Sequence, residues 1–199
     1  MASRLLLCAL LVGAPVGSSP WFSGRIIYQN EYQNAAGERL FYAAKPENWF
    51  YIQGNNFKMY DRNRKLQELY IGQANQLYRA QEGAVVLVPD TARHLAKSTI
   101  KRLATTATIL GYPCHTLQLV ADGVATLVFY SAALRVNPAG FSRCATPGWY
   151  ELLQATDGAI PLRTISVNAE RGYTATSEAT AVQAMVLPSS EFTTTAPAR

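Results

Sequence analysis

The chain is a succession of short alternating segments separated by turn residues, and this pattern constrains its fold more than any other feature. The first segment, FSGRIIYQNEYQ, alternates apolar and polar side chains from Phe22 to Gln33, and only Ile27 breaks the rule. The segments that follow are NWFYIQG, NFKMYD, RKLQELYIG, NQLYRAQ and AVVLV, with Gly-Asn, Asn-Arg, Gly-Gln and Glu-Gly breaks between them. Strands that recur about every 8–12 residues with such turns predict an antiparallel meander that closes into a sandwich or barrel.

The second half of the chain resumes the same pattern. HTLQLV and VATLVFYSA flank Asp122–Gly123, and an Asp-Gly pair between alternating segments is the strongest hairpin signal in the chain. IPLRTISVNA and YTATSEATAVQAMVL predict a final long hairpin that turns at Arg171–Gly172. The short segment WYELLQA is ambiguous between helix and strand.

One segment between the two halves has helical spacing. In PDTARHLAKSTIKRL, the Asp90 side chain can cap the free backbone N–H groups of a first helical turn. Leu95, Ile100 and Leu103 then lie near one face, and basic residues four apart lie on another. We therefore expect one amphipathic helix over Asp90–Leu103. Its basic face is either solvated or directed at anionic lipid or an acidic partner.

The N-terminus has the features of a secretory signal peptide. Arg4 precedes an apolar run from Leu5 to Val16, which is shorter than the roughly 20 residues needed to span a bilayer. A single positive charge, an apolar middle and a small-residue exit predict a signal peptide over 1–18. The alternative is a buried N-terminal helix, which glycine and proline in the run disfavour. No second apolar segment approaches spanning length, so we expect a periplasmic or extracellular protein without a transmembrane segment.

Removal of residues 1–18 leaves two of the three cysteines, Cys114 and Cys144. In an oxidising compartment such a pair is first interpreted as a disulfide. Closing that ring would stabilise the fold by roughly 3 kcal/mol in the chain-entropy model. The expected disulfide links Cys114 to Cys144.

His115, the neighbour of Cys114, raises the question of thiol catalysis. Adjacent residues of a strand point to opposite faces, so this cysteine and histidine cannot readily share a proton. The other histidine, His94, has no acid or amide partner that would orient it, and no CxxC or HxxxH spacing favours zinc. A thiol or metal enzyme remains an alternative only if Cys114 is a free thiol.

Other signals of catalysis or nucleic-acid binding are missing from the sequence. It contains no GxSxG, GxxxxGK[ST], GxGxxG or HExxH motif. The net charge of +5 is spread along the chain without a Lys/Arg run, which favours solubility over nucleic-acid binding. We therefore predict a non-enzymatic protein with no cofactor, no metal and no nucleic-acid partner.

Aromatic residues are concentrated in the first half of the chain. They either pack as ordinary strand residues or exceed what one sheet face needs and line an apolar cavity. The predicted helix would then act as a lid. On the second interpretation, the candidate ligand-binding residues are Phe22, Tyr28, Phe41, Trp49, Tyr51, Leu95 and Ile100.

The order of segments also resembles a known family. FSGRIIYQNEY, KMYDRNRKLQELY, TATILGYPCHTLQLV, IPLRTIS and ATAVQAMVLPSSEF together resemble a family of small secreted bacterial domains of unknown function. That family is similar in layout to the outer-membrane lipoprotein carriers LolA and LolB. The resemblance covers Phe22 to Phe192 and implies a mainly β (α+β) fold. This fold is a strongly curved antiparallel sheet or incomplete barrel, with one clear amphipathic helix packed on or near its concave face. It also implies a half-barrel domain over 19–192. The segment after it, TTTAPAR over 193–199, has nothing to bury, so we expect a disordered tail.

Two functional hypotheses follow. In the carriers the concave surface holds acyl chains, so the resemblance implies an exported protein that binds an apolar ligand, such as an acyl chain or a lipidated partner. The alternative is an interaction module with a filled core, which docks an envelope protein through a sheet edge or the basic helix. An open apolar groove would favour the first hypothesis and a filled concave face the second.

Overall fold

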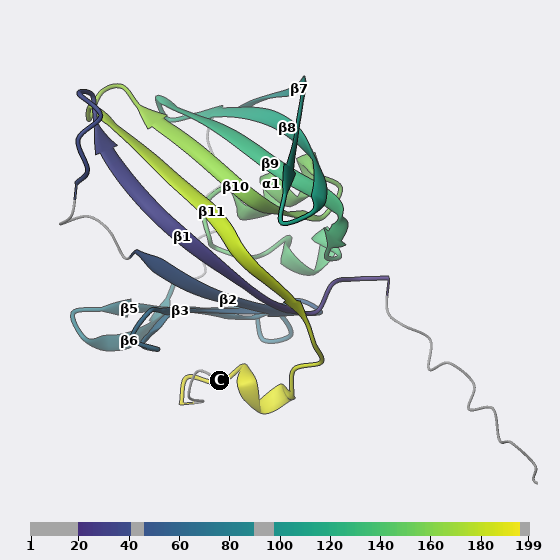
Figure 1. Cartoon of the computed structure of the whole chain (residues 1–199). Helices are drawn as coiled ribbons and strands as arrows, with labels where there is room; N and C mark the ends of the chain where they lie inside the picture. Colours follow the sequence, from purple (N-terminus) through teal and green to yellow (C-terminus); the bar gives the residue numbers. More distant parts are fainter. Residues whose placement is uncertain (1–19, 41–45, 90–97, 196–199) are drawn as a thin grey trace, which may run out of the picture.

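The structure is a computed structural model and describes residues 20–40, 46–89 and 98–195. Within these ranges the chain forms eleven strands, one α-helix and two short 3₁₀ helices (Figure 1). The strands are β1 (Gly24–Asn34), β2 (Glu47–Gln53), β3 (Asn56–Asp61), β4 (Leu66–Ile71), β5 (Gln76–Gln81), β6 (Ala84–Val88), β7 (Ser98–Ile109), β8 (Tyr112–Ala121), β9 (Val124–Arg135), β10 (Ala159–Asn168) and β11 (Tyr173–Ala184). The helices are η1 (Pro138–Phe141), α1 (Trp149–Ala155) and η2 (Ser189–Glu191).

All eleven strands belong to one antiparallel sheet in the order β6-β5-β4-β3-β2-β1-β11-β10-β9-β8-β7. Strands that are consecutive in sequence pair with each other, except β6 and β7, and β1 also pairs with β11 along its whole length, from Gly24 opposite Ala184 to Asn34 opposite Tyr173. β6 and β7 are the two edges, so the described part of the sheet is not closed into a barrel. The predicted fold class, a curved antiparallel sheet with one helix, is confirmed.

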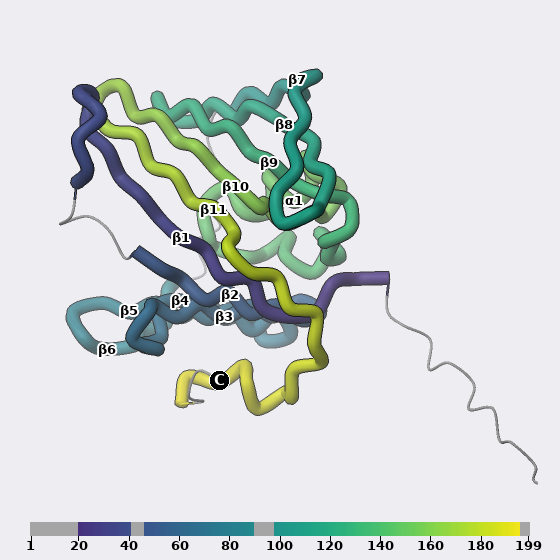
Figure 2. The backbone as a smooth tube through the Cα atoms, viewed as in Figure 1, coloured from purple at the N-terminus to yellow at the C-terminus, as the bar shows by residue number. Residues whose placement is uncertain are grey.

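The sheet turns sharply where β1 gives way to β2, so that β2–β6 form one half and β7–β11 with β1 the other (Figure 2). α1 and η1 lie on the concave side, between the halves. Trp149 of α1 contacts Phe50 and Phe57 of the first half, while Leu152 packs against a cluster of the second half that includes Leu117 and Val128. The helix therefore fills part of the space that the curvature creates.

Both predicted hairpins are present. Asp122 and Gly123 connect β8 to β9 with φ values of 48° and 76°. This left-handed geometry is the reason that an Asp-Gly pair favours a tight hairpin. β10 and β11 form the second hairpin, which turns before Tyr173.

The predicted helix over Asp90–Leu103 is wrong in the part that the structure describes, because β7 begins at Ser98. Ile100 and Leu103 therefore lie on a strand, paired with β8. The sequence STIKRLATTATI is rich in β-branched residues, which favour strands over helices. Residues 90–97, including Leu95, lie outside the described ranges.

The helix that the structure does contain is α1, in the segment that the pattern left ambiguous. Gly148 precedes it with a φ of 72°, a left-handed conformation that favours glycine, and Glu151 places a negative charge in the first turn. Leu153 is completely buried. Among the described residues, no helix has the length and apolar character that crossing a membrane requires.

Residues 1–18 of the predicted signal peptide lie outside the described ranges, as do residues 196–199 of the predicted tail. Thr193, the first residue of that tail, accepts a hydrogen bond through its carbonyl from Lys58 Nζ at 2.7 Å.

Candidate functional site

An apolar cavity of about 280 Å³ lies on the concave side of the sheet, beside α1. Its walls come from β1–β4, from β10 and β11, and from the segment that begins at Thr146 and continues into α1. The lining residues are Tyr28, Asn48, Phe50, Phe57, Met59, Glu68, Thr146, Trp149, Leu152, Pro161, Thr164 and Ser177. Segments far apart in the sequence therefore border one space.

Strand pairing explains why these side chains share a face. Phe50 lies opposite Met59, and Met59 lies opposite Glu68. In the other half, Thr164 lies opposite Ser177. Directly opposed residues of antiparallel strands point to the same side of the sheet, so each pair contributes two neighbouring positions to the cavity wall.

Three aromatic rings of the wall pack against one another. The ring centroids of Phe50 and Trp149 are 5.8 Å apart, those of Phe57 and Trp149 are 5.9 Å apart, and those of Phe50 and Phe57 are 5.6 Å apart. Both contacts of Trp149 are edge-to-face, an arrangement that aromatic pairs favour. α1 is thereby fixed to β2 and β3 at the cavity.

Several polar groups of the wall form hydrogen bonds or ion pairs within the protein. The Tyr28 hydroxyl donates to the Pro161 carbonyl at 2.7 Å, and burial raises the pKa of Tyr28. Glu68 accepts a hydrogen bond from the Thr146 hydroxyl and forms an ion pair with Arg79 at 3.2 Å. These groups stabilise the wall and leave its surface apolar.

Two buried polar atoms of lining residues differ from this pattern. Asn48 Oδ1 and Trp149 Nε1 have no hydrogen-bond partner among the described residues. One is an acceptor and the other a donor. Buried polar atoms are normally paired, so each such exception requires an explanation.

The structure places one predicted ligand-binding residue, Tyr28, in the cavity wall. Phe22 is in the main core cluster but does not line the cavity. Ile100 lies on β7 and is 41% exposed, because the helix that should have directed it inward is a strand. Phe41 and Leu95 lie outside the described residues.

Trp49 and Tyr51 belong to β2 but point to the opposite, convex face. They pack there with Tyr60, Leu69 and residues of the C-terminal segment. Consecutive residues of a strand face opposite sides, so Trp49 and Tyr51 cannot share a face with Phe50. The prediction chose two aromatic residues from the wrong face of the correct strand.

The predicted Cys114–Cys144 disulfide is absent, and both residues are buried free thiols. They have different surroundings. Arg163 is a charged neighbour of Cys114, whereas Glu68 and Arg79 are those of Cys144. Burial raises the pKa of both thiols, which favours the protonated, less nucleophilic form. The described residues include no group of three or more potential metal ligands.

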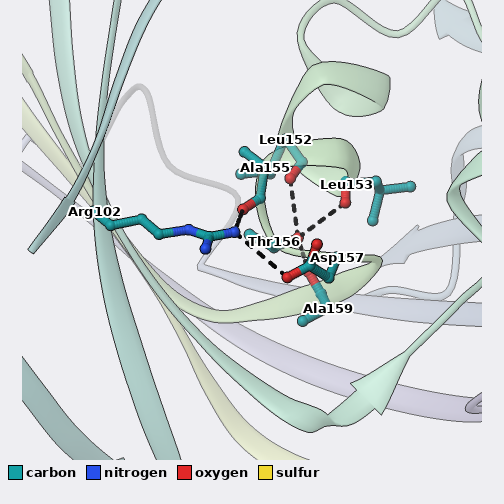
Figure 3. A network of polar contacts seen from close by, with 7 residues as sticks. All are labelled: Arg102, Leu152, Leu153, Ala155, Thr156, Asp157 and Ala159. Atoms are coloured by element: carbon teal, nitrogen blue, oxygen red, sulfur yellow. Dashed lines mark hydrogen bonds and ion pairs between the residues drawn. The ribbon is translucent and has the colours of Figure 1, made fainter.

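A polar network holds the C-terminal end of α1 against β7 and β10 (Figure 3). The Thr156 hydroxyl lies 2.9 Å from the Leu152 carbonyl and 2.7 Å from the Ala159 carbonyl. Arg102 reaches from β7 to the Ala155 carbonyl at 3.2 Å, and a cation at this end complements the helix dipole. The network keeps in place the helix that contributes Trp149 to the cavity.

The sequence analysis missed the contribution of α1 and the loop before it. Trp149 and Leu152 are three residues apart, a spacing that places two side chains on one side of a helix. This signal was present in WYELLQA but too short to distinguish helix from strand. No sequence signal indicated that Glu68 lines the cavity, because its place in the wall depends on the register between β3 and β4.

Comparisons with known proteins support the fold and assign no family. No protein-family model matches the chain, and no curated protein matches it. Among solved structures, PNGF-II in space group P21 matches with a TM-score of 0.51 and 15% identity. This match covers 85% of the present chain and 30% of the PNGF-II chain, so the chain spans less than a third of that protein.

Two further matches have lower TM-scores. The LolA superfamily protein NE2245 from Nitrosomonas europaea has a TM-score of 0.40 at 12% identity, with 88% of the present chain and 91% of that chain covered. The MucA/MucB complex structure of Pseudomonas aeruginosa has a TM-score of 0.41 at 10% identity, with coverages of 84% and 54%. A LolA superfamily protein is thus among the structural matches, at low sequence identity and a TM-score below 0.5.

Proposed function

We propose that this protein is a non-enzymatic, exported binding protein that holds a small apolar ligand, such as a segment of an acyl chain, in the cavity of its concave face. The observation that carries the proposal is the cavity itself, which has about 280 Å³ of space bounded mainly by aromatic and aliphatic side chains. Export rests on the signal-peptide pattern of residues 1–18.

The volume supports a ligand of limited size. A cavity of about 150 Å³ lined by Leu, Ile and Phe is enough to bind benzene, and pockets for drug-sized ligands begin near 300 Å³. A volume of about 280 Å³ therefore suits one apolar chain segment or a small ring system. It does not suit several acyl chains together.

The alternative, an interaction module with a filled core, predicts that the concave face has no internal space. The cavity favours ligand binding over this alternative. Core residues near the cavity, such as Phe141 and Leu153, are at 0% exposure.

The test is displacement of a neutral fluorescent dye, N-phenylnaphthylamine, from the full exported chain. We expect the dye to bind with increased fluorescence, and medium-chain alcohols to displace it. Ser177→Phe fills the cavity and should abolish dye binding, since Ser177 is a lining residue.

Thr176→Phe is the matched control, because the adjacent residue of β11 points to the other face of the sheet. Dye binding that survives Ser177→Phe, or is lost equally in both variants, would contradict the proposal. Native mass spectrometry of the purified protein adds a direct search for a retained ligand.

A further inference from the structure

The charged groups around the cavity are distributed unevenly, and this bears on the polar end of a ligand. Glu68 is the one acidic residue of the wall, and the described lining includes no Lys, Arg or His. The side chain of Glu68 is only 13% exposed. A ligand in this cavity therefore meets a carboxylate and no cation.

The nearest cation to this carboxylate is already in use. Arg79 Nε pairs with one oxygen of Glu68 at 3.2 Å, while the Thr146 hydroxyl donates to the other. Charge-assisted hydrogen bonds of this kind are among the strong ones. Arg79 is thus held by Glu68, and it is not one of the lining residues of the cavity.

Two lining residues also carry a buried polar atom that has no hydrogen-bond partner among the described residues. Asn48 Oδ1 needs a donor and Trp149 Nε1 needs an acceptor. A hydroxyl or an amide carries both a donor and an acceptor, whereas a carboxylate carries acceptors only. A carboxylate would in addition bring an uncompensated charge into an apolar site beside Glu68, which is strongly unfavourable.

We infer that the cavity selects amphiphiles with an uncharged polar end, an alcohol or an amide, and rejects free fatty acids. This inference rests on the proposed function, since it concerns which ligand the same cavity holds. It goes beyond that function by predicting discrimination between ligands of equal chain length.

The experiment compares decanol, decanamide and decanoate as competitors of N-phenylnaphthylamine at pH 8, below the solubility limits of decanol and decanamide and the critical micelle concentration of decanoate. We expect decanol and decanamide to displace the dye, and decanoate to need a concentration at least about tenfold higher. Equal displacement by decanoate and decanol would overturn the inference and leave the proposed function intact. Failure of the dye and of all three competitors to bind would instead remove the proposed function.

Glu68→Gln tests the cause of the selectivity, because it removes the negative charge and releases Arg79. The ratio of decanoate to decanol affinity should rise at least about tenfold in this variant. Glu31→Gln is the control. Glu31 forms an ion pair with Arg39 at 2.7 Å and is not a lining residue of this cavity, so the substitution should leave the ratio unchanged. An unaltered ratio in folded Glu68→Gln would overturn the electrostatic explanation. The wild-type comparison remains decisive if that variant does not fold.

Discussion

The two faces of strands β2–β4 are equally rich in aromatic residues, yet they are covered very differently. On the convex face, Tyr51 and Tyr60 pack edge-to-face at 5.7 Å beneath Leu187 and Phe192 of the C-terminal segment. On the concave face, Phe50 and Phe57 border the cavity. Aromatic density therefore predicts burial of a face, but not whether the chain itself supplies the cover.

The polar groups of the two faces differ in the same way. On the convex face, Lys58 Nζ donates to the Glu191 carbonyl at 2.9 Å. Gln53 both donates to the Leu187 carbonyl and accepts from its amide. On the concave face, Asn48 Oδ1 and Trp149 Nε1 have no partner among the described residues. On the convex face, the C-terminal segment thus supplies hydrogen-bond partners to Lys58 and Gln53.

The largest expected effect is on stability, from removal of one large ring on either face. Phe192→Ala should lower the free energy of unfolding by about 3 kcal/mol and leave dye binding unchanged, because Phe192 covers the convex face. Phe57→Ala should cost about 4 kcal/mol and also alter dye affinity, because Phe57 lines the cavity. Urea denaturation and dye titration measure the two properties. Altered dye affinity in Phe192→Ala would show that the faces are not independent.

A smaller effect is expected from the buried lysine of the convex face. Lys58→Met should lower the free energy of unfolding by about 2 kcal/mol, because the carbonyls of Glu191 and Thr193 lose their shared donor. The exposed Lys65, in the turn before β4, provides the control variant Lys65→Met. The comparison is made by urea denaturation at pH 7. Equal stability of the two variants would mean that the C-terminal segment is held by its apolar side chains alone.

The pH dependence of stability compares one tyrosine from each face. Burial raises the pKa of Tyr28 on the concave face, and burial together with Glu191 raises the pKa of Tyr60 on the convex face. The folded protein keeps both hydroxyls protonated. Their contribution to stability is therefore present below the tyrosine pKa of the unfolded chain, near 10, and is lost as the pH rises above it.

Raising the pH from 8 to 11 should therefore lower the free energy of unfolding by about 1.4 kcal/mol for each of the two tyrosines. Tyr28→Phe and Tyr60→Phe should each remove that share of the decline, as measured by urea denaturation at the two pH values. A decline that both variants leave unaltered would rule out these tyrosines as its source.

The smallest effect concerns the cysteines. Cys114→Ala and Cys144→Ala should each cost about 1 kcal/mol, the effect of removing one small buried group. A disulfide would instead make either substitution cost about 3 kcal/mol. Intact-mass measurement and thiol titration of the unfolded, unreduced protein provide the independent readout. Two titratable thiols are expected, and a mass lower by two hydrogens would restore the disulfide.

What the sequence predicted well was local. Alternation and turn chemistry predicted the strands and the Asp122–Gly123 hairpin, because both depend on a few neighbouring residues. The helix over Asp90–Leu103 failed where four-residue spacing competed with the β-branched residues of Ser98–Ile109, which pair with β8. Tertiary pairing prevailed over a weak periodicity there.

The cavity was beyond local reasoning. Its wall joins Tyr28 to Trp149 and Ser177, and their proximity depends on the curvature of the whole sheet. The choice between Phe50 and its neighbours Trp49 and Tyr51 required knowing which face the C-terminal segment covers. Alternation along β2 shows that Phe50 points to the face opposite that of Trp49 and Tyr51, but not which of the two faces is the concave one.

The order of strands has a consequence for the integrity of the chain. The two edges, β6 and β7, are consecutive in sequence, whereas the first and last strands, β1 and β11, pair at the centre of the sheet. A single backbone cut between Val88 and Ser98 would thus break no interstrand ladder of the described sheet. It would yield two fragments joined along the β1–β11 pair, so the protein is suited to reconstitution from separately produced halves.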